Sequence, residues 1–285
     1  MTISRRTSWA VCIAAATLIA VPAAATAGTA HRAAGGTGTA TASQAADTTD
    51  ATDATDAAVD AYYAPAEGKT GAALKAALHG IVKNQSRISY DAVWNALKVT
   101  DQDPANPNNV VLVYSGRSQS KSTNGGGAND WNREHVWAKS HGDFGTATGP
   151  GTDLHHLRPE DVTVNSTRGN KDFDRGGSPV AEAPGSYTDA DSFEPRNAVK
   201  GDVARMLLYM AVRYDGGDGF PDLEMNDRTA NGSAPAIGRI SVLKEWNRLD
   251  PPDAFEKRRN QVIYDAYQHN RNPFIDHPEW VDSIW

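Results

Sequence analysis

The first 60 residues confine the fold to the remainder of the chain. Residues 28–60 are mostly Ala, Thr, Gly and Asp in near-repeats such as DTTDATDATDA, with almost no large apolar side chain. Such a composition cannot bury enough apolar surface to offset the entropy lost on ordering, so we predict a disordered acidic spacer. About 225 residues remain in the segment 61–285, enough for one substantial core. We therefore expect a single folded domain over 61–285.

The N-terminus has the order of regions typical of a secretory signal peptide. Arg5 and Arg6 precede the apolar stretch WAVCIAAATLIAV, and the small residues PAAATAGTA follow it. The apolar run is shorter than the roughly 20 residues that a membrane span needs, which favours cleavage near Ala27 over a retained anchor. We therefore predict a signal peptide over 1–27 and a secreted, extracellular protein without membrane attachment.

Cysteine usage and charge narrow the classes of protein further. The only cysteine, Cys12, lies in the predicted signal peptide, so the mature chain is expected to hold no disulfide. The full chain carries a net charge of −7; three arginines and five aspartates lie in 1–60, which leaves the domain at −5. A nucleic-acid ligand would therefore have to be met by a local basic patch and a metal ion rather than by the overall field.

Apolar periodicity predicts a mixture of helices and strands. Helices are predicted at 71–83, 89–97, 198–214 and 253–268, with Ser89 as an N-cap of the second and a strongly amphipathic pattern in the third. The run NVVLVYSG (109–116) predicts a buried strand, and the polar segment 116–130 predicts a loop. The expected fold class is α+β.

Two stretches dense in polar residues interrupt this pattern, DWNREHVWAKSHG (130–142) and DLHHLRPED (153–161). The first predicts a strand at 132–137 that places an arginine, a glutamate and a histidine side by side, where a strand normally alternates polar with apolar. A short strand is predicted at 153–157, and a helix that begins at Pro159 and carries Asn165 and Arg168 on one face. A hairpin capped by that helix would bring His135 and Asn165 together in a compact metal site.

Glu134 and His135 present a geometric difficulty. Neighbouring residues on a regular strand point to opposite faces, so both can serve one site only if the strand twists or bulges. We therefore expect an irregular strand end at this pair.

Four blocks of the domain resemble the signature segments of the endonuclease I family. These are NREHVWAKSHG, DLHHLRPEDVTVNSTRGN, FEPRNAVKGDVARMLLYMAVRY and NRNPFIDHPEW, and the likeness runs from about Tyr62 to Trp285. The resemblance implies a secreted, metal-dependent, sequence-nonspecific endonuclease built around a ββα-metal (His-Me) finger. It also implies a nucleic-acid substrate, DNA with RNA as an open alternative, and 5′-phosphorylated products.

Carried over residue by residue, the resemblance makes His135 the general base and Glu134 and Asn165 the metal ligands. A neutral imidazole is suited to take a proton from water attacking a phosphodiester. A hard cation such as Mg²⁺ prefers oxygen ligands and keeps several waters, so one carboxylate and one amide oxygen suffice from the protein. Mn²⁺ or Ca²⁺ are expected substitutes, and the metal would stabilise the leaving oxygen.

The roles of the flanking residues stay open at this point. Arg168 would either stabilise the charge on the scissile phosphate or form an ion pair with Asp172 or Glu160. The adjacent histidines His155 and His156 are expected to support the hairpin and orient the general base, and His141 is expected to be a loop histidine.

Two departures from the family pattern bear on catalytic strength. Well-known members hold disulfides and a longer insertion after the Glu-His pair, with an arginine that stabilises the product phosphate. No arginine lies between Lys139 and Thr152 here, so Arg158 or Arg168 takes that role or it is vacant. Ala138 also stands where a proline is usual.

Near the C-terminus, NRNPFIDHP contains Asn270, Arg271 and Asn272. The arginine and the second asparagine would either contact nucleic acid at the border of its groove or form a turn.

Two other classes of protein compete with a nuclease. A zinc hydrolase or secreted metal-binding protein could draw on His135, His155, His156 and Glu160, although zinc prefers three or four such ligands and no HExxH spacing occurs. A non-catalytic binder of extracellular DNA is disfavoured by the acidic domain. In each case a monomer is expected.

Overall fold

A computed structural model describes residues 57–285, so the predicted signal peptide and residues 28–56 of the predicted spacer lie outside the described residues. Residues 57–63 are helical, and Val59 packs against the main hydrophobic cluster together with Tyr62 and Tyr63. The predicted end of the spacer at residue 60 is therefore wrong. The apolar side chains on this short segment bring residues 57–60 into the folded unit.

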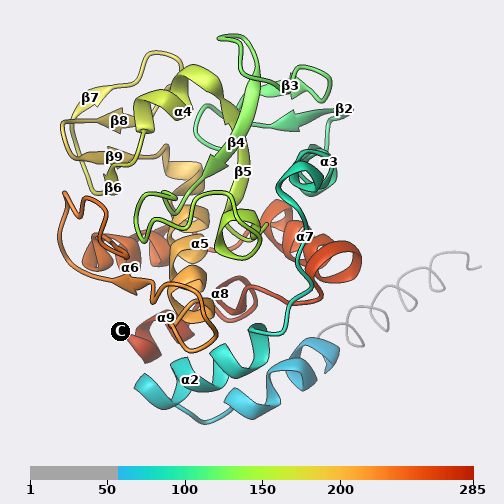
Figure 1. Cartoon of the computed structure of the whole chain (residues 1–285), viewed down its shortest axis with the longest axis vertical. Coiled ribbons are helices and arrows are strands. Elements are labelled where there is room, and N and C mark those ends of the chain that lie inside the picture. Colours follow the sequence, from blue (N-terminus) through green and yellow to red (C-terminus); the bar gives the residue numbers. More distant parts are fainter. Residues whose placement is uncertain (1–56) are drawn as a thin grey trace, which may run out of the picture. The chain divides into compact units, whose positions relative to one another are not determined.

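The α+β class is confirmed by short sheets among many helices (Figure 1). The labelled helices are α2 (Gly71–Val82), α3 (Tyr90–Thr100), α4 (Val162–Arg168), α5 (Lys200–Arg213), α6 (Ile240–Leu249), α7 (Ala254–Ile263), α8 (Pro273–Asp276) and α9 (Trp280–Ile284), and a π-helical turn (Tyr264–Gln268) continues α7. The strands are β1 (Gln102–Asp103), β2 (Asn106–Val111), β3 (Ser118–Ser120), β4 (Trp131–His135), β5 (Leu157–Asp161), β6 (Asp172–Phe173), β7 (Ser178–Pro179), β8 (Tyr187–Thr188), β9 (Ser192–Glu194), β10 (Glu224–Met225) and β11 (Ala236–Ile237).

The strands form separate small sheets. Strands β1, β2 and β3 form an antiparallel sheet, and β4 forms a two-stranded antiparallel sheet with β5. A four-stranded sheet has the order β6-β9-β8-β7, with β6 parallel to β9, and β10 pairs in parallel with β11. The predicted loop 116–130 thus contains β3, and the strand predicted at 109–116 is observed as β2, which begins and ends earlier.

Helix α5 passes through the middle of the folded unit, where it contacts α2, α6 and α8 (Figure 1). The sequence predicts an amphipathic helix here, but every residue from Gly201 to Arg213 is buried. A helix that is buried all round can carry charged residues only if each has a partner, because an unpaired buried charge is very costly. Asp202, Arg205 and Arg213 all meet this condition.

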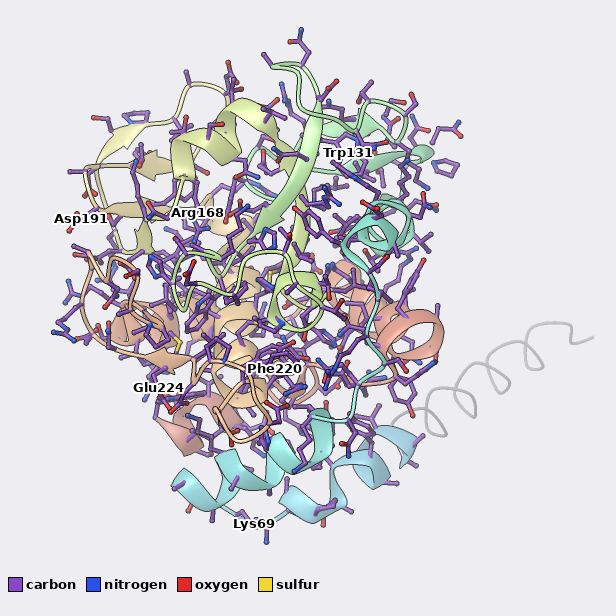
Figure 2. All side chains as sticks on the ribbon, in the orientation of Figure 1. Lys69, Trp131, Arg168, Asp191, Phe220 and Glu224 are labelled. Atoms are coloured by element: carbon purple, nitrogen blue, oxygen red, sulfur yellow. The ribbon has the colours of Figure 1, made fainter. Side chains whose placement is uncertain are left out.

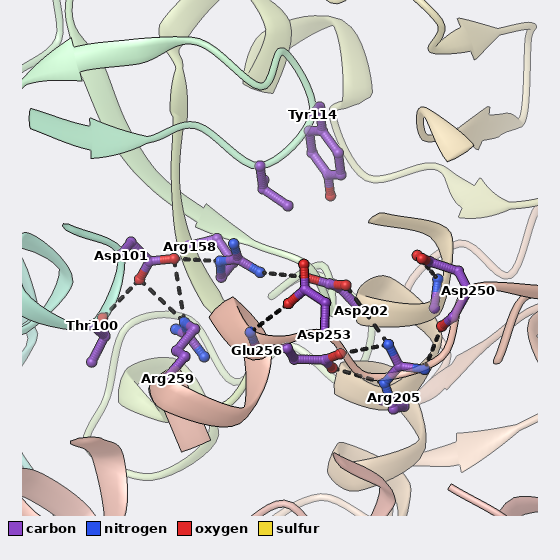
Figure 3. A network of polar contacts seen from close by, with 12 residues as sticks. Thr100, Asp101, Tyr114, Arg158, Asp202, Arg205, Asp250, Asp253, Glu256 and Arg259 are labelled. Atoms are coloured by element: carbon purple, nitrogen blue, oxygen red, sulfur yellow. Dashed lines mark hydrogen bonds and ion pairs between the residues drawn. The ribbon is translucent and has the colours of Figure 1, made fainter. Parts of the chain in front are cut away.

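A buried ion-pair network connects α5 with three other elements (Figure 3). Arg158 of β5 donates through Nε to Asp101 at 2.5 Å, and its Nη1 lies 3.4 Å from Asp202 of α5. Arg259 of α7 also contacts Asp101, at 3.2 Å. Arg205 of α5 pairs with Glu256 of α7 at 2.5 Å. Three carboxylates therefore face three guanidinium groups, and together they join β5 to the end of α3, to α5 and to α7.

Strand β4 lies between two hydrophobic clusters. Trp131, at its start, belongs to the cluster that includes Val93 and Leu97 of α3, and Figure 2 shows it on the side of the strand facing that helix. Val136 and Trp137, which directly follow the strand, belong to the main cluster around α5. Packing on both sides holds the hairpin in place.

The hairpin and its helix exist, but the predicted second strand at 153–157 is wrong. The strand is β5, Leu157–Asp161, and α4 begins at Val162 rather than at Pro159. Pro159 lies opposite Arg133 in the ribbon, and its carbonyl accepts a hydrogen bond from the backbone N–H of Val113 at 3.0 Å. Asp161 caps the helix, since its carboxylate accepts from the backbone N–H groups of Thr163 and Val164.

Glu160 of β5 predicts a pH dependence of stability. Its carboxyl is fully buried, Oε1 has no partner among the described residues, and burial raises its pKa from 4.5 to about 7. Between these values only the unfolded chain ionises, so this carboxyl should lower the free energy of unfolding as pH rises through that window, by on the order of 3 kcal/mol. We expect the free energy of unfolding, measured with urea, to differ less between pH 5 and pH 8 for Glu160→Gln than for the wild type. Equal differences would contradict this assignment.

Candidate active site

A cavity of about 390 Å³ lies where the β4–β5 hairpin meets the end of α4. Glu134, His135 and Asn165 all line it, so the structure brings together the three residues that the sequence singles out. The other lining residues are Tyr90, Trp94, Gly125, Asn132, Arg133, Ala138, Lys139, Ser140, Gly169 and Asn170.

The expected irregular strand end is not observed. Pairing between β4 and β5 is regular from Trp131 opposite Asp161 to His135 opposite Leu157. Glu134 and His135 nevertheless both line the cavity, which lies at the end of the strand and also receives residues 138–140. Two-stranded ribbons twist more strongly than wide sheets, and this twist at a strand end is our explanation for the shared cavity.

His135 is held as a neutral base. Its Nε2 lies 3.1 Å from the carbonyl oxygen of Gly151, and because a carbonyl only accepts, Nε2 carries the hydrogen. Nδ1 is then the unprotonated nitrogen. Burial lowers the pKa of His135 well below its usual value, and nearby His156 lowers it further. The imidazole therefore stays neutral and able to accept a proton.

Glu134 is buried with one oxygen engaged. Its Oε1 accepts from the hydroxyl of Tyr114 at 2.8 Å and from Nη1 of Arg168 at 3.0 Å. Burial raises the pKa of this carboxyl, and Arg168 opposes the rise. Both of these side-chain hydrogen bonds use Oε1. They leave Oε2 for another ligand.

Asn165 presents an amide oxygen to the same cavity. Its Nδ2 donates to Oδ1 of Asn132 at 2.6 Å, so its own Oδ1 is not used in that bond. Gly169 ends the helix with a φ of +60°, a conformation that favours glycine. A carboxylate oxygen and an amide oxygen facing one polar cavity fit a hard divalent cation, which takes oxygen ligands and keeps water in its remaining positions.

The two adjacent histidines lie behind the site. Nε2 of His156 donates to the carbonyl of Pro150 at 2.7 Å, and Nδ1 accepts from the backbone of Trp137 at 3.3 Å. Its ring lies 5.6 Å from that of His135, and burial lowers its pKa to about 4. His155 contacts Asn270 at 3.2 Å, and burial likewise lowers its pKa to about 4. Neither lines the cavity, and the supporting role of the two histidines stays a prediction.

The two arginines suggested for the phosphate are both buried away from the cavity. Arg168 pairs with Glu134, and not with Asp172 or Glu160 as the sequence suggests, and it donates to the carbonyls of His135 and Val136 at 2.7 and 2.6 Å. Figure 2 shows it inside the fold beside β4. Arg158 belongs to the buried network. The sequence around an arginine does not show which distant carboxylate it will contact, so these ion pairs could not be predicted.

The C-terminal residues suggested as nucleic-acid contacts have structural roles. Asn272 is fully buried, caps α8 and donates to the carbonyl of Arg205 at 3.0 Å. Arg271 pairs with Asp276 at 2.7 Å. Both residues thus hold the start of α8 in place, and a contact with nucleic acid stays a prediction. His141 is buried between the carbonyls of Ala236 and Asn170, each at 2.8 Å.

The ligands suggested for a zinc site do not converge. Within residues 57–285, no three His, Cys, Asp or Glu side chains are placed to hold a metal ion. Glu160 instead accepts from the backbone N–H groups of Tyr114 and Ser115. The structure does not support the zinc alternative.

Arg133 is a lining residue that sequence reasoning left without a role. Its guanidinium carbon lies 3.5 Å from the ring centre of Tyr90 and 4.0 Å from that of Trp94. Its position directly before Glu134 and His135 is the feature of the sequence that could have indicated a place in the cavity.

Comparisons with known proteins identify the family of the chain. The family model described as Endonuclease I matches residues 70–279. An extracellular ribonuclease of Bacillus amyloliquefaciens is 68% identical over 226 residues, 79% of this chain and 78% of the relative, and one of Bacillus subtilis (strain 168) is 67% identical over the same shares. An extracellular deoxyribonuclease of Aeromonas hydrophila is 30% identical over 129 residues, 44% of this chain and 49% of the relative.

The extracellular location of these relatives confirms the prediction that the protein is secreted. Over residues 57–285, no helix has the length and apolar character needed to cross a membrane. The family match covers most of the domain, includes every residue of the Glu134, His135 and Asn165 site, and names a family of metal-dependent nucleases. The chain belongs to the Endonuclease I family.

Proposed function

We propose that the protein is a Mg²⁺-dependent, sequence-nonspecific endonuclease that cleaves both RNA and DNA and leaves 5′-phosphorylated ends. The observation that carries this proposal is the single cavity lined by Glu134, His135 and Asn165, with the imidazole hydrogen fixed on Nε2 by Gly151. The relatives named ribonucleases and deoxyribonucleases support a substrate class defined by its phosphodiester backbone.

His135 would act through Nδ1, accepting the proton from the water that attacks the phosphorus. Arg168 would act as a positioning residue, because it holds the Glu134 carboxylate and the backbone of His135 and Val136 without reaching the cavity. Glu134 and Asn165 would hold the metal ion, which when bound stabilises negative charge on the phosphate and leaving oxygen. Mn²⁺ and Ca²⁺ are the substitutes to test.

The proposed chemistry separates this enzyme from ribonucleases that use the 2′ hydroxyl. If His135 activates water, the 2′ hydroxyl is not needed, so DNA should be cut as well as RNA. We expect fragments with 5′ phosphate and 3′ hydroxyl from both substrates in the presence of Mg²⁺, as measured by end-labelling and mass spectrometry. Cyclic 2′,3′-phosphate ends, or cleavage that persists in excess chelator, would contradict the proposal.

Sequence preference should be weak, because the proposed groups address phosphate and water rather than base edges. Sequencing the ends of fragments from a limited digest would test this. A sharply defined recognition site would contradict it, whereas mild preferences that follow DNA shape would not.

Replacement of the metal ligands should raise the Mg²⁺ concentration needed for half-maximal activity. We expect Asn165→Ala and Glu134→Gln to raise it at least about tenfold, since replacing even outer partners of a ligand costs that much. The glutamine variant keeps the shape that contacts Tyr114 and Arg168.

Ser166→Ala is the matched control for these variants, because Ser166 is exposed and follows Asn165 on α4. Its metal titration should match that of the wild type. Unchanged titrations for both ligand variants would place the metal elsewhere.

A further inference from the structure

The cavity that contains the catalytic residues is also lined by two cations, Arg133 and Lys139. A nuclease substrate brings a phosphate beside the scissile bond on each side, and Arg158 and Arg168, both buried in ion pairs, do not line the cavity. Arg133 is half-buried and Lys139 is exposed. The cavity is therefore lined by one partly buried cationic side chain, Arg133, and by one solvent-exposed cationic side chain, Lys139.

Two aromatic rings and a carbonyl fix the position of Arg133. Its guanidinium carbon lies 3.5 Å from the ring centre of Tyr90 and 4.0 Å from that of Trp94, both in α3. Nη1 donates to the backbone carbonyl of Tyr90 at 2.6 Å. A side-chain hydrogen bond also joins Arg133 to Tyr90, and the guanidinium donors not used in these two contacts are left for an acceptor from outside.

Arg133 also forms no ion pair with any described carboxylate. Burial lowers its pKa, and the nearby Tyr90 and Asp91 oppose this. A half-buried guanidinium that faces a polar cavity and has donors to spare is complementary to an anion, because phosphate oxygens can accept two parallel hydrogen bonds from its planar fork.

We propose that Arg133 binds a backbone phosphate of the substrate next to the scissile bond, with Tyr90 and Trp94 holding its guanidinium in the required orientation. This assignment rests on the proposed nuclease function and fills the role that the sequence offered to Arg158 or Arg168. Preorganisation by the two rings reduces the loss of side-chain freedom when the phosphate binds. Lys139, being exposed, adds charge without orientation.

The competing explanation is that Arg133 only joins β4 to α3. In that case its loss would lower stability, and activity would fall only as far as the fold does. Arg87 offers a matched control, because it is an exposed arginine 4.9 Å from the ring centre of Phe220 and does not line the cavity.

The test compares Arg133→Ala, Arg133→Lys and Arg87→Ala in the full-length mature protein. We expect Arg133→Ala to lower kcat/KM on a short oligonucleotide about 10- to 100-fold, the cost of a lost charge-assisted contact. Affinity is measured in a His135→Asn background across salt concentrations. The slope of log Kd against log salt should shrink by about 0.7 to 0.9, one phosphate contact. Arg133→Lys should keep the slope and lose part of the activity, and Arg87→Ala should match the wild type.

An unchanged salt slope in Arg133→Ala would overturn the assignment, as would a loss of activity that disappears at a temperature where the variant is fully folded. If Arg133→Ala does not fold, Arg133→Lys decides, and wild-type kcat/KM in a folded lysine variant would exclude a two-point contact. Failure of the wild type to cut any nucleic acid with Mg²⁺ or Mn²⁺ would instead refute the proposed function. If the wild type cuts nucleic acid and substitution of Arg133 changes neither kcat/KM nor the salt slope, only the role proposed for Arg133 is refuted.

Discussion

Replacing His135 with alanine is expected to lower kcat/KM by roughly 10²–10⁴-fold, the contribution of a positioned general base. The imidazole donates through Nε2 to Gly151 and keeps Nδ1 unprotonated, so its removal takes away the proton acceptor. Glu134 and Asn165 keep their own contacts with Arg168 and Asn132 in this variant. The metal titration should therefore stay close to that of the wild type, measured as activity remaining against Mg²⁺ concentration.

Two further variants separate base catalysis from packing. His135→Gln places an amide nitrogen near the position of Nε2, so it can still donate to the Gly151 carbonyl but has no basic nitrogen, and it should be as inactive as the alanine variant and more stable. His269→Asn removes an exposed imidazole outside the cavity, at a left-handed position that asparagine tolerates, and should leave activity unchanged. Near-wild-type turnover by His135→Gln would exclude His135 as the base.

That the residues of the candidate site line one cavity could be predicted from the sequence, but their contacts could not. Arg133, Glu134 and His135 stand out because a strand that only packs a core has no use for three consecutive polar side chains. Which of the domain's arginines reaches the cavity depends on the packing of segments far apart in sequence. Arg168 turns inward to Glu134, 34 residues earlier in the chain, and Arg158 turns to Asp101, 57 residues earlier.

The second strand shows the same limit at the level of the fold. The run DLHHLRPED contains both the predicted strand at 153–157 and the observed one, and local propensity favours a helix start at Pro159. Pairing with β4 decides otherwise, because Trp131 must lie opposite Asp161 for its ring to reach the cluster beside α3. Asp161 then caps the helix three residues later than predicted. Helix α5 differs for a related reason: its pattern is amphipathic, and only the partners of its charged residues allow it to be buried all round.

The buried ion-pair network connects the stability of the domain to the position of the β4–β5 hairpin. Arg158 lies directly opposite Glu134 in the β4–β5 ladder, and its guanidinium extends from there to Asp101 and Asp202 (Figure 3). Arg259 shares Asp101 and also donates to the carbonyls of Leu154 and Leu157, each at 2.6 Å. The turn before β5 and the strand itself are therefore held by two guanidinium groups that share one aspartate, Asp101.

Asp101→Ala is expected to lower the free energy of unfolding by about 3–5 kcal/mol, because it leaves the buried Arg158 and Arg259 without their shared carboxylate. For a domain of this size such a loss corresponds to a fall in Tm of roughly 6–20 °C. Asp101→Asn keeps the shape and can still accept hydrogen bonds, so it should lose less. The matched control is Glu245→Ala, which breaks the exposed pair with Arg175 and should cost at most about 1 kcal/mol. Thermal and urea unfolding of the three variants would decide, and equal losses from Asp101→Ala and Glu245→Ala would show that the network does not hold β5 in place.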